Sequence, residues 1–254
     1  MLERLLALEA FSYFLVFTRL GATVMLLPGI GEGYVPVRVR LLIALVITAV
    51  MQPVVAPLLP EAPDSIIALL MLLLGEVLVG VFIATVARVL VTTLITTGTV
   101  IAFLTGFANA VLFNPMLQDQ GAMTAVFLSL LGTLLIFVTD LHHLMFMAMM
   151  DSYTMFKPGV ALPLDDFAEV IGRMVSASFK IGVQLAAPFI LVTMLFYISL
   201  GLLARLMPQF QVFFVGLPLQ ILLGLTVLMV TISSIMMWFM DYFATGMARL
   251  IEAG

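Results

Sequence analysis

Long apolar runs occupy most of the chain and are separated by short polar segments. A helix needs about 20 apolar residues to cross the hydrocarbon core of a bilayer, and six runs reach that length with no more than two charged residues each. They predict an all-α membrane protein. The first run is expected to belong to the mature protein, because it contains two charged residues and lacks the features of a cleaved signal. The runs are Leu5–Pro28, Leu41–Pro60, Ile66–Ala87, Gln120–Met150, Ile181–Ala204 and Leu206–Met240.

The segment Val89–Gln118 carries no charge but is more polar than the runs around it. It contains six threonines up to Thr105, and Asn114–Pro115 is a typical turn sequence. Such a segment is too polar for a helix that faces lipid, and non-helical backbone at membrane depth is tolerated only inside protein or beside water. The pattern predicts that Val89–Gln120 is a helix that enters the assembly and then becomes a re-entrant, buried loop.

Prolines and glycines interrupt the predicted helices. An interior proline removes a backbone hydrogen bond and bends the helix, so neighbouring helices must satisfy the freed carbonyl groups. We therefore expect bent, Pro/Gly-broken helices packed within a larger assembly. The residues are Pro28, Pro53, Pro57, Pro188, Pro208, Pro218, Gly75, Gly80, Gly216 and Gly224.

The charges between the apolar runs predict an orientation, because basic loops favour the cytoplasmic side of a membrane. Arg88 is expected to end the third helix on that side, while the acidic loop Asp151–Glu169 lies outside. One crossing at about residues 122–150, with a re-entrant segment 89–121, satisfies both expectations. The other basic residues expected on the cytoplasmic side are Arg38, Arg40 and Arg205.

Composition supports the membrane assignment and excludes several functions. The chain is 64% hydrophobic and 9% charged, whereas an average soluble domain is about 25% charged, and its mean hydropathy is +1.28. Its net charge of −4 and lack of a basic tract argue against nucleic-acid binding, and the absence of cysteine excludes disulfides and thiolate sites. A Gly-rich phosphate loop and a Ser-His-Asp set are also missing, so we expect neither an enzyme nor a cofactor.

One group of residues is suited by type to bind a metal or to transfer protons. It consists of Asp140, His142, His143 and Asp151. Histidine with a carboxylate could bind zinc or relay protons. There is, however, no His-Glu-x-x-His pattern and no clear third ligand. The two aspartates flank the apolar run Leu141–Met150, as residues at a helix end do at the membrane interface, so we expect a helix end without a metal.

Glu76 lies within the third apolar run. A carboxylate inside a membrane is costly, so the first hypothesis is that it has a function. The alternative is a structural hydrogen bond or ion pair between helices, with Arg19 or Arg88 as the partner. We favour the structural pair and leave its partner open.

Short strings along the chain occur in the order typical of one known family. They are Arg19 before Pro28, the loop Tyr34–Arg40, Glu76 with Gly80, Gly98, Gly106 and Asn114–Pro115, His142, and Arg205 with Pro208, Gln209, Val212, Phe213 and Gly216–Pro218. Together they resemble the FliR family of flagellar export-gate proteins, called SctT in virulence injectisomes, over residues 10–240. Two positions depart from the family pattern. Asn114 replaces an aspartate, and Asp140-Leu141 replaces Asn-Gly.

The resemblance implies a single copy of this chain in a hetero-oligomeric ring with FliP-type and FliQ-type subunits. Residues 1–180 would be similar to a FliP-type subunit, and residues 181–254 to a FliQ-type hairpin of the last two helices with a C-terminal tail. The loop at about 106–121 would plug the closed pore, and FlhA-type and FlhB-type export proteins would be further partners. The implied plug residues are Gly106, Phe107, Asn109, Phe113, Asn114, Pro115 and Met116. Arg205, Pro208 and Gln209 would contact cytoplasmic partners, and Arg19, Glu76 and Arg88 would form polar pairs within the membrane.

Taken together, the residues and the resemblance predict a structural and gating subunit of the flagellar type III export channel. It would lie in the bacterial inner membrane, at the flagellar basal body, and pass unfolded exported proteins. The alternative is a secondary transporter of a small solute, which the broken helices and Glu76, Arg88 and His142 would suit. No inverted repeat is visible to support a transporter, and an intramembrane zinc hydrolase lacks enough ligands.

Overall fold

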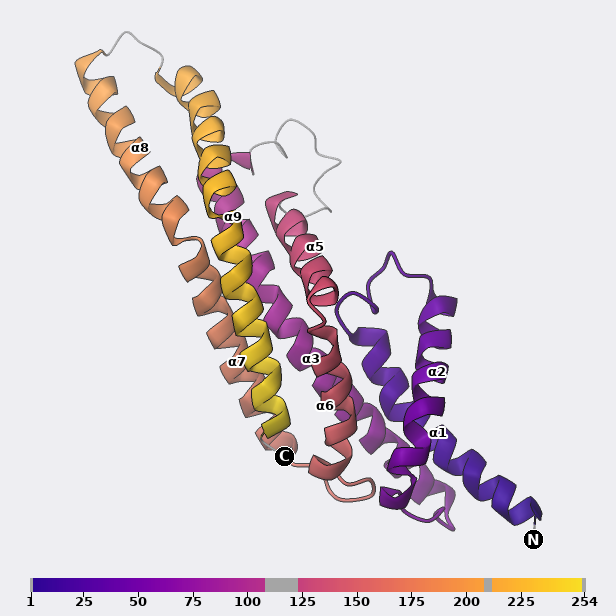
Figure 1. Cartoon of the computed structure of the whole chain (residues 1–254). Coiled ribbons are helices and arrows are strands. Elements are labelled where there is room, and N and C mark those ends of the chain that lie inside the picture. Colours follow the sequence, from indigo (N-terminus) through magenta and orange to yellow (C-terminus); the bar gives the residue numbers. More distant parts are fainter. Residues whose placement is uncertain (1, 108–122, 208–211, 253–254) are drawn as a thin grey trace. The chain divides into compact units, whose positions relative to one another are not determined.

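The computed structural model describes residues 2–107, 123–207 and 212–252 (Figure 1). Within these residues every regular element is a helix, which confirms the prediction of an all-α protein. The elements are α1 (Leu2–Leu26), α2 (Val37–Val55), the 3-10 helix η1 (Ala56–Leu58), α3 (Ile66–Thr105), α5 (Met123–Val138), α6 (His142–Met155), α7 (Leu164–Leu185), α8 (Ala187–Leu206) and α9 (Val212–Glu252).

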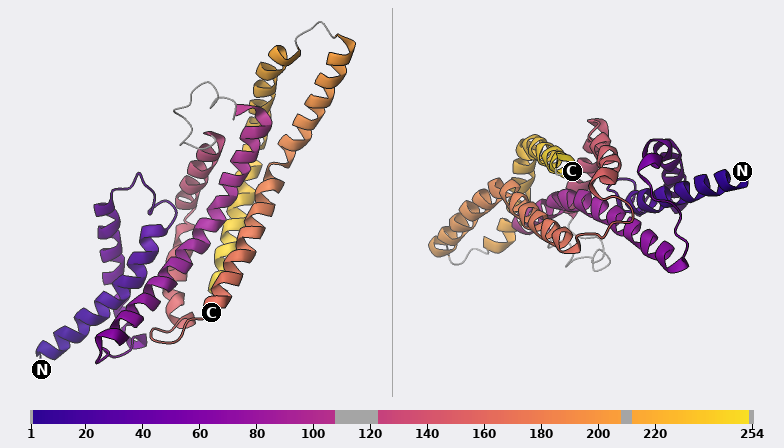
Figure 2. Two further views of the ribbon diagram at one scale, coloured as in Figure 1. Left: turned by 180° about the vertical axis from the view of Figure 1, so that it is seen from behind. Right: turned by 90° about the horizontal axis from the view of Figure 1, so that it is seen from below.

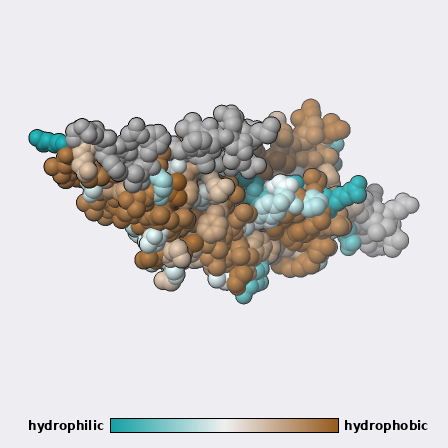
Figure 3. All heavy atoms as spheres, turned by 90° about the horizontal axis from the view of Figure 1, so that it is seen from above, coloured by the Kyte–Doolittle hydropathy of each residue, from teal (hydrophilic) through white to brown (hydrophobic). Residues whose placement is uncertain are grey.

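Most of these helices are long and apolar enough to cross a membrane. In the described part of the chain α1, α2, α3, α8 and α9 each contain such a window, and α5 with α6 qualifies when the pair is taken as one broken span. Large apolar side chains are exposed along them, among them Ile66, Val230 and Met229, and the face drawn in Figure 3 is largely hydrophobic. Patches of this extent are unfavourable in water, so lipid or another apolar protein must cover them.

The chain forms two compact units, each assembled from separate stretches of sequence. The first unit contains residues 1–90, 136–174 and 243–254. Its core includes fully buried Leu15, Leu20 and Ile83, together with an aromatic cluster in which the rings of Phe82 and Phe167 stack 4.1 Å apart.

The second unit contains residues 91–135 and 175–242 and depends on small residues for close helix packing. A Cβ on Gly98 would lie 2.3 Å from the Cα of Ala125, and a Cβ on Gly224 would lie 2.4 Å from the Cγ2 of Thr105. Small residues allow helices in membranes to approach in this way. Figures 1 and 2 show α8 and the first part of α9 side by side as a hairpin. The predicted division at residue 180 remains a prediction.

The third helix is longer than predicted. α3 continues from Ile66 to Thr105, so the expectation that it ends at Arg88 is wrong. Several of its threonine hydroxyls bond to carbonyl groups one turn earlier, such as Thr97 to Thr93 at 2.8 Å and Thr105 to Ile101 at 2.7 Å. Their polarity is therefore satisfied inside the helix. α3 ends at Thr105, and Gly106 follows it with a φ of +79°, which is typical of a glycine cap. Residues 108–121 of the predicted loop lie outside the described part.

Several prolines do not break helices. α2 continues through Pro53, and α9 continues through Pro218 as far as Glu252, so residues 241–252 extend this helix and do not form a separate tail. Pro188 lies in the first turn of α8, where the missing N–H has no helical partner to lose. The position of each proline in its helix therefore decides its effect.

The predicted acidic loop Asp151–Glu169 is mostly helical. Asp151 belongs to α6, and α7 begins at Leu164 with Asp165 and Asp166 in its first turn. Carboxylates stabilise the positive N-terminal end of a helix, which explains why charge does not prevent the helix here. Between α5 and α6 the chain bends by 74° at residues 139–141, and Asp140 has a φ of +61°.

Candidate functional site

Arg19 of α1 and Glu76 of α3 form a buried ion pair in the first unit. The Nε of Arg19 donates to the Oε2 of Glu76 at 2.7 Å, and Nη2 donates to Oε1 at 2.9 Å. The two side chains are only 1% and 2% exposed. A bidentate pair of this kind is directional as well as strong, so it fixes the two helices relative to each other at this level.

The same guanidinium also binds the C-terminal end of α6. Nη1 donates to the carbonyl oxygen of Ser152 at 2.9 Å and to its hydroxyl at 3.2 Å, while Nη2 donates to the carbonyl oxygen of Phe156 at 2.8 Å. The Cζ of Arg19 lies 4.1 Å from the centre of the Tyr153 ring. A cation at this position interacts favourably with the helix dipole and satisfies terminal carbonyl groups. Arg19 therefore joins three helices.

Gly80, one turn after Glu76, allows α1 and α3 to approach this closely. A Cβ at Gly80 would lie 2.4 Å from the carbonyl oxygen of Arg19, so any larger residue would push the two helices apart. The hydroxyl of Thr23 bonds to the carbonyl oxygens of Arg19 at 2.9 Å and of Gly80 at 3.2 Å. The spacing of Glu76 and Gly80 thus places an acid and a close contact on the same face of α3.

Arg88, the other proposed partner of Glu76, binds elsewhere. Its Nη2 lies 3.7 Å from the Oε1 of Glu32 and donates to the carbonyl oxygen of Gly31 at 3.3 Å, while its Nε donates to the carbonyl oxygen of Leu26. Arg88 therefore holds the end of α1 and the loop that follows it. Because it lies inside α3 and not in a loop, the orientation argument that used Arg88 as a loop charge does not hold.

A second polar network lies where α3 ends, in the second unit. The Nε2 of Gln220 on α9 donates to the carbonyl oxygen of Leu104 at 2.6 Å and to the hydroxyl of Tyr197 at 3.1 Å. The hydroxyl of Thr193 donates to the same carbonyl oxygen at 3.4 Å. Sequence reasoning missed this network, although one buried glutamine within an uncharged apolar run was the available signal. It satisfies a carbonyl group that a helix end leaves without a helical partner.

Most of the other predicted site residues lie outside the described residues. Of the predicted plug, the structure describes Gly106 at the end of α3 and Phe107 directly after it, and of the predicted cytoplasmic contact it describes Arg205 in the last turn of α8. The remaining residues fall in the undescribed segments: Asn109, Phe113, Asn114, Pro115, Met116, Pro208 and Gln209.

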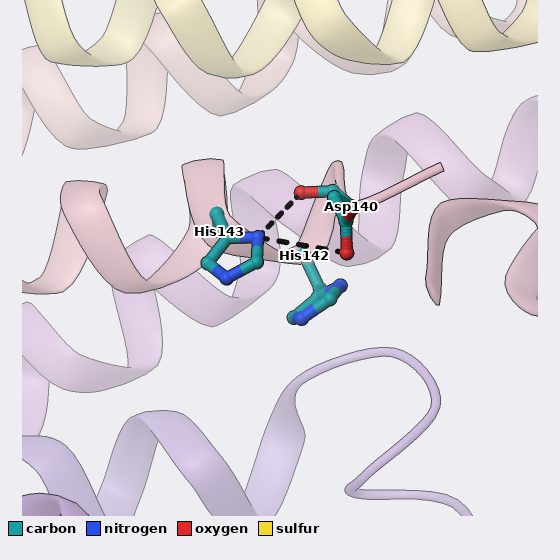
Figure 4. Close-up of side chains that lie close together, drawn as sticks. All are labelled: Asp140, His142 and His143. Carbon is teal, nitrogen blue, oxygen red and sulfur yellow. Dashed lines mark hydrogen bonds and ion pairs between the residues drawn. The ribbon is translucent and has the colours of Figure 1, made fainter. Parts of the chain in front are cut away.

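Asp140, His142 and His143 lie together at the break between α5 and α6 (Figure 4). One potential ligand atom from each lies within 4.8 Å of the others. Asp151, which sequence reasoning placed with them, is not part of this cluster. The break therefore contains three groups that can bind a metal, where the sequence pattern had offered no clear third ligand.

Comparison with known proteins identifies the family. The family described as "Bacterial export proteins, family 1" matches residues 10–246. The flagellar biosynthetic protein FliR of Caulobacter vibrioides is 40% identical over 235 residues, covering 92% of this chain and 94% of that protein. The proteins of the same name from Bacillus subtilis and Aquifex aeolicus are both 27% identical and cover 88% and 95% of this chain and 87% and 91% of their own lengths. This chain therefore belongs to the FliR family of bacterial export proteins.

Proposed function

We propose that this chain is a structural and gating subunit of the bacterial flagellar protein-export channel. It would lie in the inner membrane at the flagellar basal body and help to pass unfolded exported proteins. The observation that carries the proposal is the family match over residues 10–246, with a 40% identical FliR protein covered over 94% of its length. Because the matching family is one of export proteins, we do not propose the transport of small solutes.

The proposed partners are FliP-type and FliQ-type subunits in a ring, together with FlhA-type and FlhB-type export proteins. The exposed side chains of α7 support a protein partner. This helix is not among the candidate membrane spans, and it exposes an ion pair between Arg173 and Glu169 as well as large apolar Val175 and Phe179. A surface that mixes charge with large apolar groups suits a protein interface better than the interior of a bilayer.

The proposed gate is the segment at about 106–121. Asn109 and Asn114 would be costly in hydrocarbon without hydrogen bonds, whereas Phe107, Phe113 and Met116 would be poorly placed in water. A protein pore accommodates both kinds of residue, with apolar groups closing the channel and polar groups bonded to its wall. Leu104, two residues before the segment, accepts a hydrogen bond from Gln220 of α9 through its carbonyl oxygen. This contact fixes the position from which the segment starts.

Expression of the chain without its partners is expected to give degraded or aggregated protein. Its exposed apolar side chains, such as Met229 at 80% exposure and Val230 at 75%, need cover from lipid and from other subunits. Co-expression with FliP-type and FliQ-type subunits should restore the protein level, measured by immunoblotting, and yield one complex on size-exclusion chromatography. A stable monomer that transports a small solute would contradict the proposed function.

The turn after Arg205 is expected to face the cytoplasm, where it would meet the partner proteins. The natural chain contains no cysteine, so Gln209→Cys provides a single reactive thiol. We expect a membrane-impermeant maleimide to label it in inverted membrane vesicles and not in intact spheroplasts. Arg38→Cys, expected on the same side, serves as the matched control, and labelling of Gln209→Cys from the periplasmic side would disprove the orientation.

A further inference from the structure

The cluster at the break between α5 and α6 brings together three ligand groups to which the proposed function gives no role. Asp140 lies in the break, and His142 and His143 are the first two residues of α6. Figure 4 shows the carboxylate and both imidazole rings beside one another, with one ligand atom of each within 4.8 Å of the others. Two imidazoles and a carboxylate are a donor set that zinc accepts.

The ring of His143 turns one of its nitrogen atoms toward Asp140 (Figure 4). The Nδ1 of His143 lies 3.0 Å from the carbonyl oxygen of Asp140. This nitrogen also lies 3.9 Å from the Oδ1 of Asp140, so it faces the carboxylate, and zinc bound to it would replace the contact with the carbonyl oxygen.

The ring of His142 is held by aromatic packing. It stacks on Phe137, with the ring centres 5.2 Å apart, and meets Phe146 edge-on at 5.9 Å. Its Nδ1 is buried and has no hydrogen-bond partner among the described residues. Buried polar atoms without a partner are rare and require an explanation, and a bound metal would supply one.

The backbone of Asp140 is also unusual. Its φ of +61° lies in the left-handed region, and it is the one non-glycine residue with a positive φ in the described part of the chain. The Oδ1 of its carboxylate lies 3.9 Å from the Nδ1 of His143. Backbone strain is retained where surrounding contacts require it, and it often occurs at binding sites.

We propose that Asp140, His142 and His143 bind a zinc ion. One carboxylate oxygen and two imidazole nitrogens would fill three positions, and water would complete a tetrahedral arrangement. The carboxylate offsets one of the two positive charges of the metal. Because the ligands come from the break and from the first turn of α6, the ion would fix the conformation of residues 140–143. This inference stands on the geometry of the cluster and does not depend on the gating proposal.

Zinc binding can be measured on the purified export complex in detergent, after treatment with a chelator. After dialysis against zinc chloride, elemental analysis gives the zinc content of each complex. The wild type is expected to bind one zinc ion more per copy of this chain than the variant His143→Ala. Thermal unfolding should shift upward with zinc in the wild type and not in the variant. Asp151→Asn, which changes a carboxylate of the same helix outside the cluster, is the matched control and should behave as the wild type does.

Two further variants distinguish lost ligands from a disturbed fold. Asp140→Asn removes the charge and retains a residue type that tolerates the left-handed region, and His142→Phe keeps an aromatic ring between Phe137 and Phe146. Each should weaken zinc binding at least about tenfold. A wild-type complex that binds no zinc beyond that bound by His143→Ala, or equal binding in all the variants, would overturn the proposal.

Discussion

Replacement of Arg19 by methionine is expected to destabilise the folded protein by about 3–5 kcal/mol, because it leaves the buried charge of Glu76 without a partner. It also removes the hydrogen bonds to Ser152 and Phe156 at the end of α6. Glu76→Leu should cost a similar amount, since it leaves the guanidinium unpaired. The measurement is thermal unfolding of the detergent-solubilised complex, together with swimming motility as a readout of export.

The double variant Arg19→Met with Glu76→Met separates the ion pair from the other contacts. Apolar replacement of both partners of a buried pair is often close to neutral, so the double variant should be more stable than either single variant. It should not reach the wild type, because the carbonyl groups of Ser152 and Phe156 lose their donor. The matched control is Arg173→Met, which breaks an exposed pair with Glu169 and should cost less than about 1 kcal/mol. Equal effects of Arg19→Met and Arg173→Met would contradict this account of the buried site.

Deletion of Phe107–Gln118 is expected to leave the complex assembled and to make the membrane leak ions and small solutes. The reason is the proposed role of this segment as the plug. Thr105, which precedes the deleted residues, keeps its close contact with Gly224 of α9. Leakage can be measured by conductance in planar bilayers or by sensitivity of cells to antibiotics that normally stay outside. A complex that no longer assembles would assign the segment to scaffolding, and one that assembles and stays closed would refute the plug.

Point variants within the segment make this test sharper. If apolar groups close the channel, replacing Phe113 and Met116 by serine should produce leakage without loss of assembly. Replacing Asn109 and Asn114 by serine keeps both the apolar groups and two polar side chains, and it should leave the channel closed. Equal leakage from the two double variants would contradict the proposal that apolar side chains close the channel while polar side chains attach the segment to its wall.

The amphipathic helix α7 shows what a search for apolar runs misses. Its charged residues, Asp165 and Asp166 in the first turn among them, lower the average hydropathy of the segment, so its first residues were predicted as part of an acidic loop. The available signal was the helical period of its apolar positions. In α3 the error was different: the helix was expected to end at Arg88, but it continues to Thr105, and hydroxyls of its threonines bond within the helix.

The class of this protein can be read from its pattern of apolar residues. Each of the six apolar runs overlaps a described helix or the α5–α6 pair, because hydropathy and the need to satisfy backbone groups within one segment are local properties. Which polar groups meet depends on how the helices pack. Arg19 pairs with Glu76, 57 residues away, and reaches Ser152, 133 residues away, while Arg88 binds Glu32. Such pairs depend on helix faces that come together only when the chain packs. The sequence therefore showed which polar residues lie in apolar runs but not which of them pair with each other.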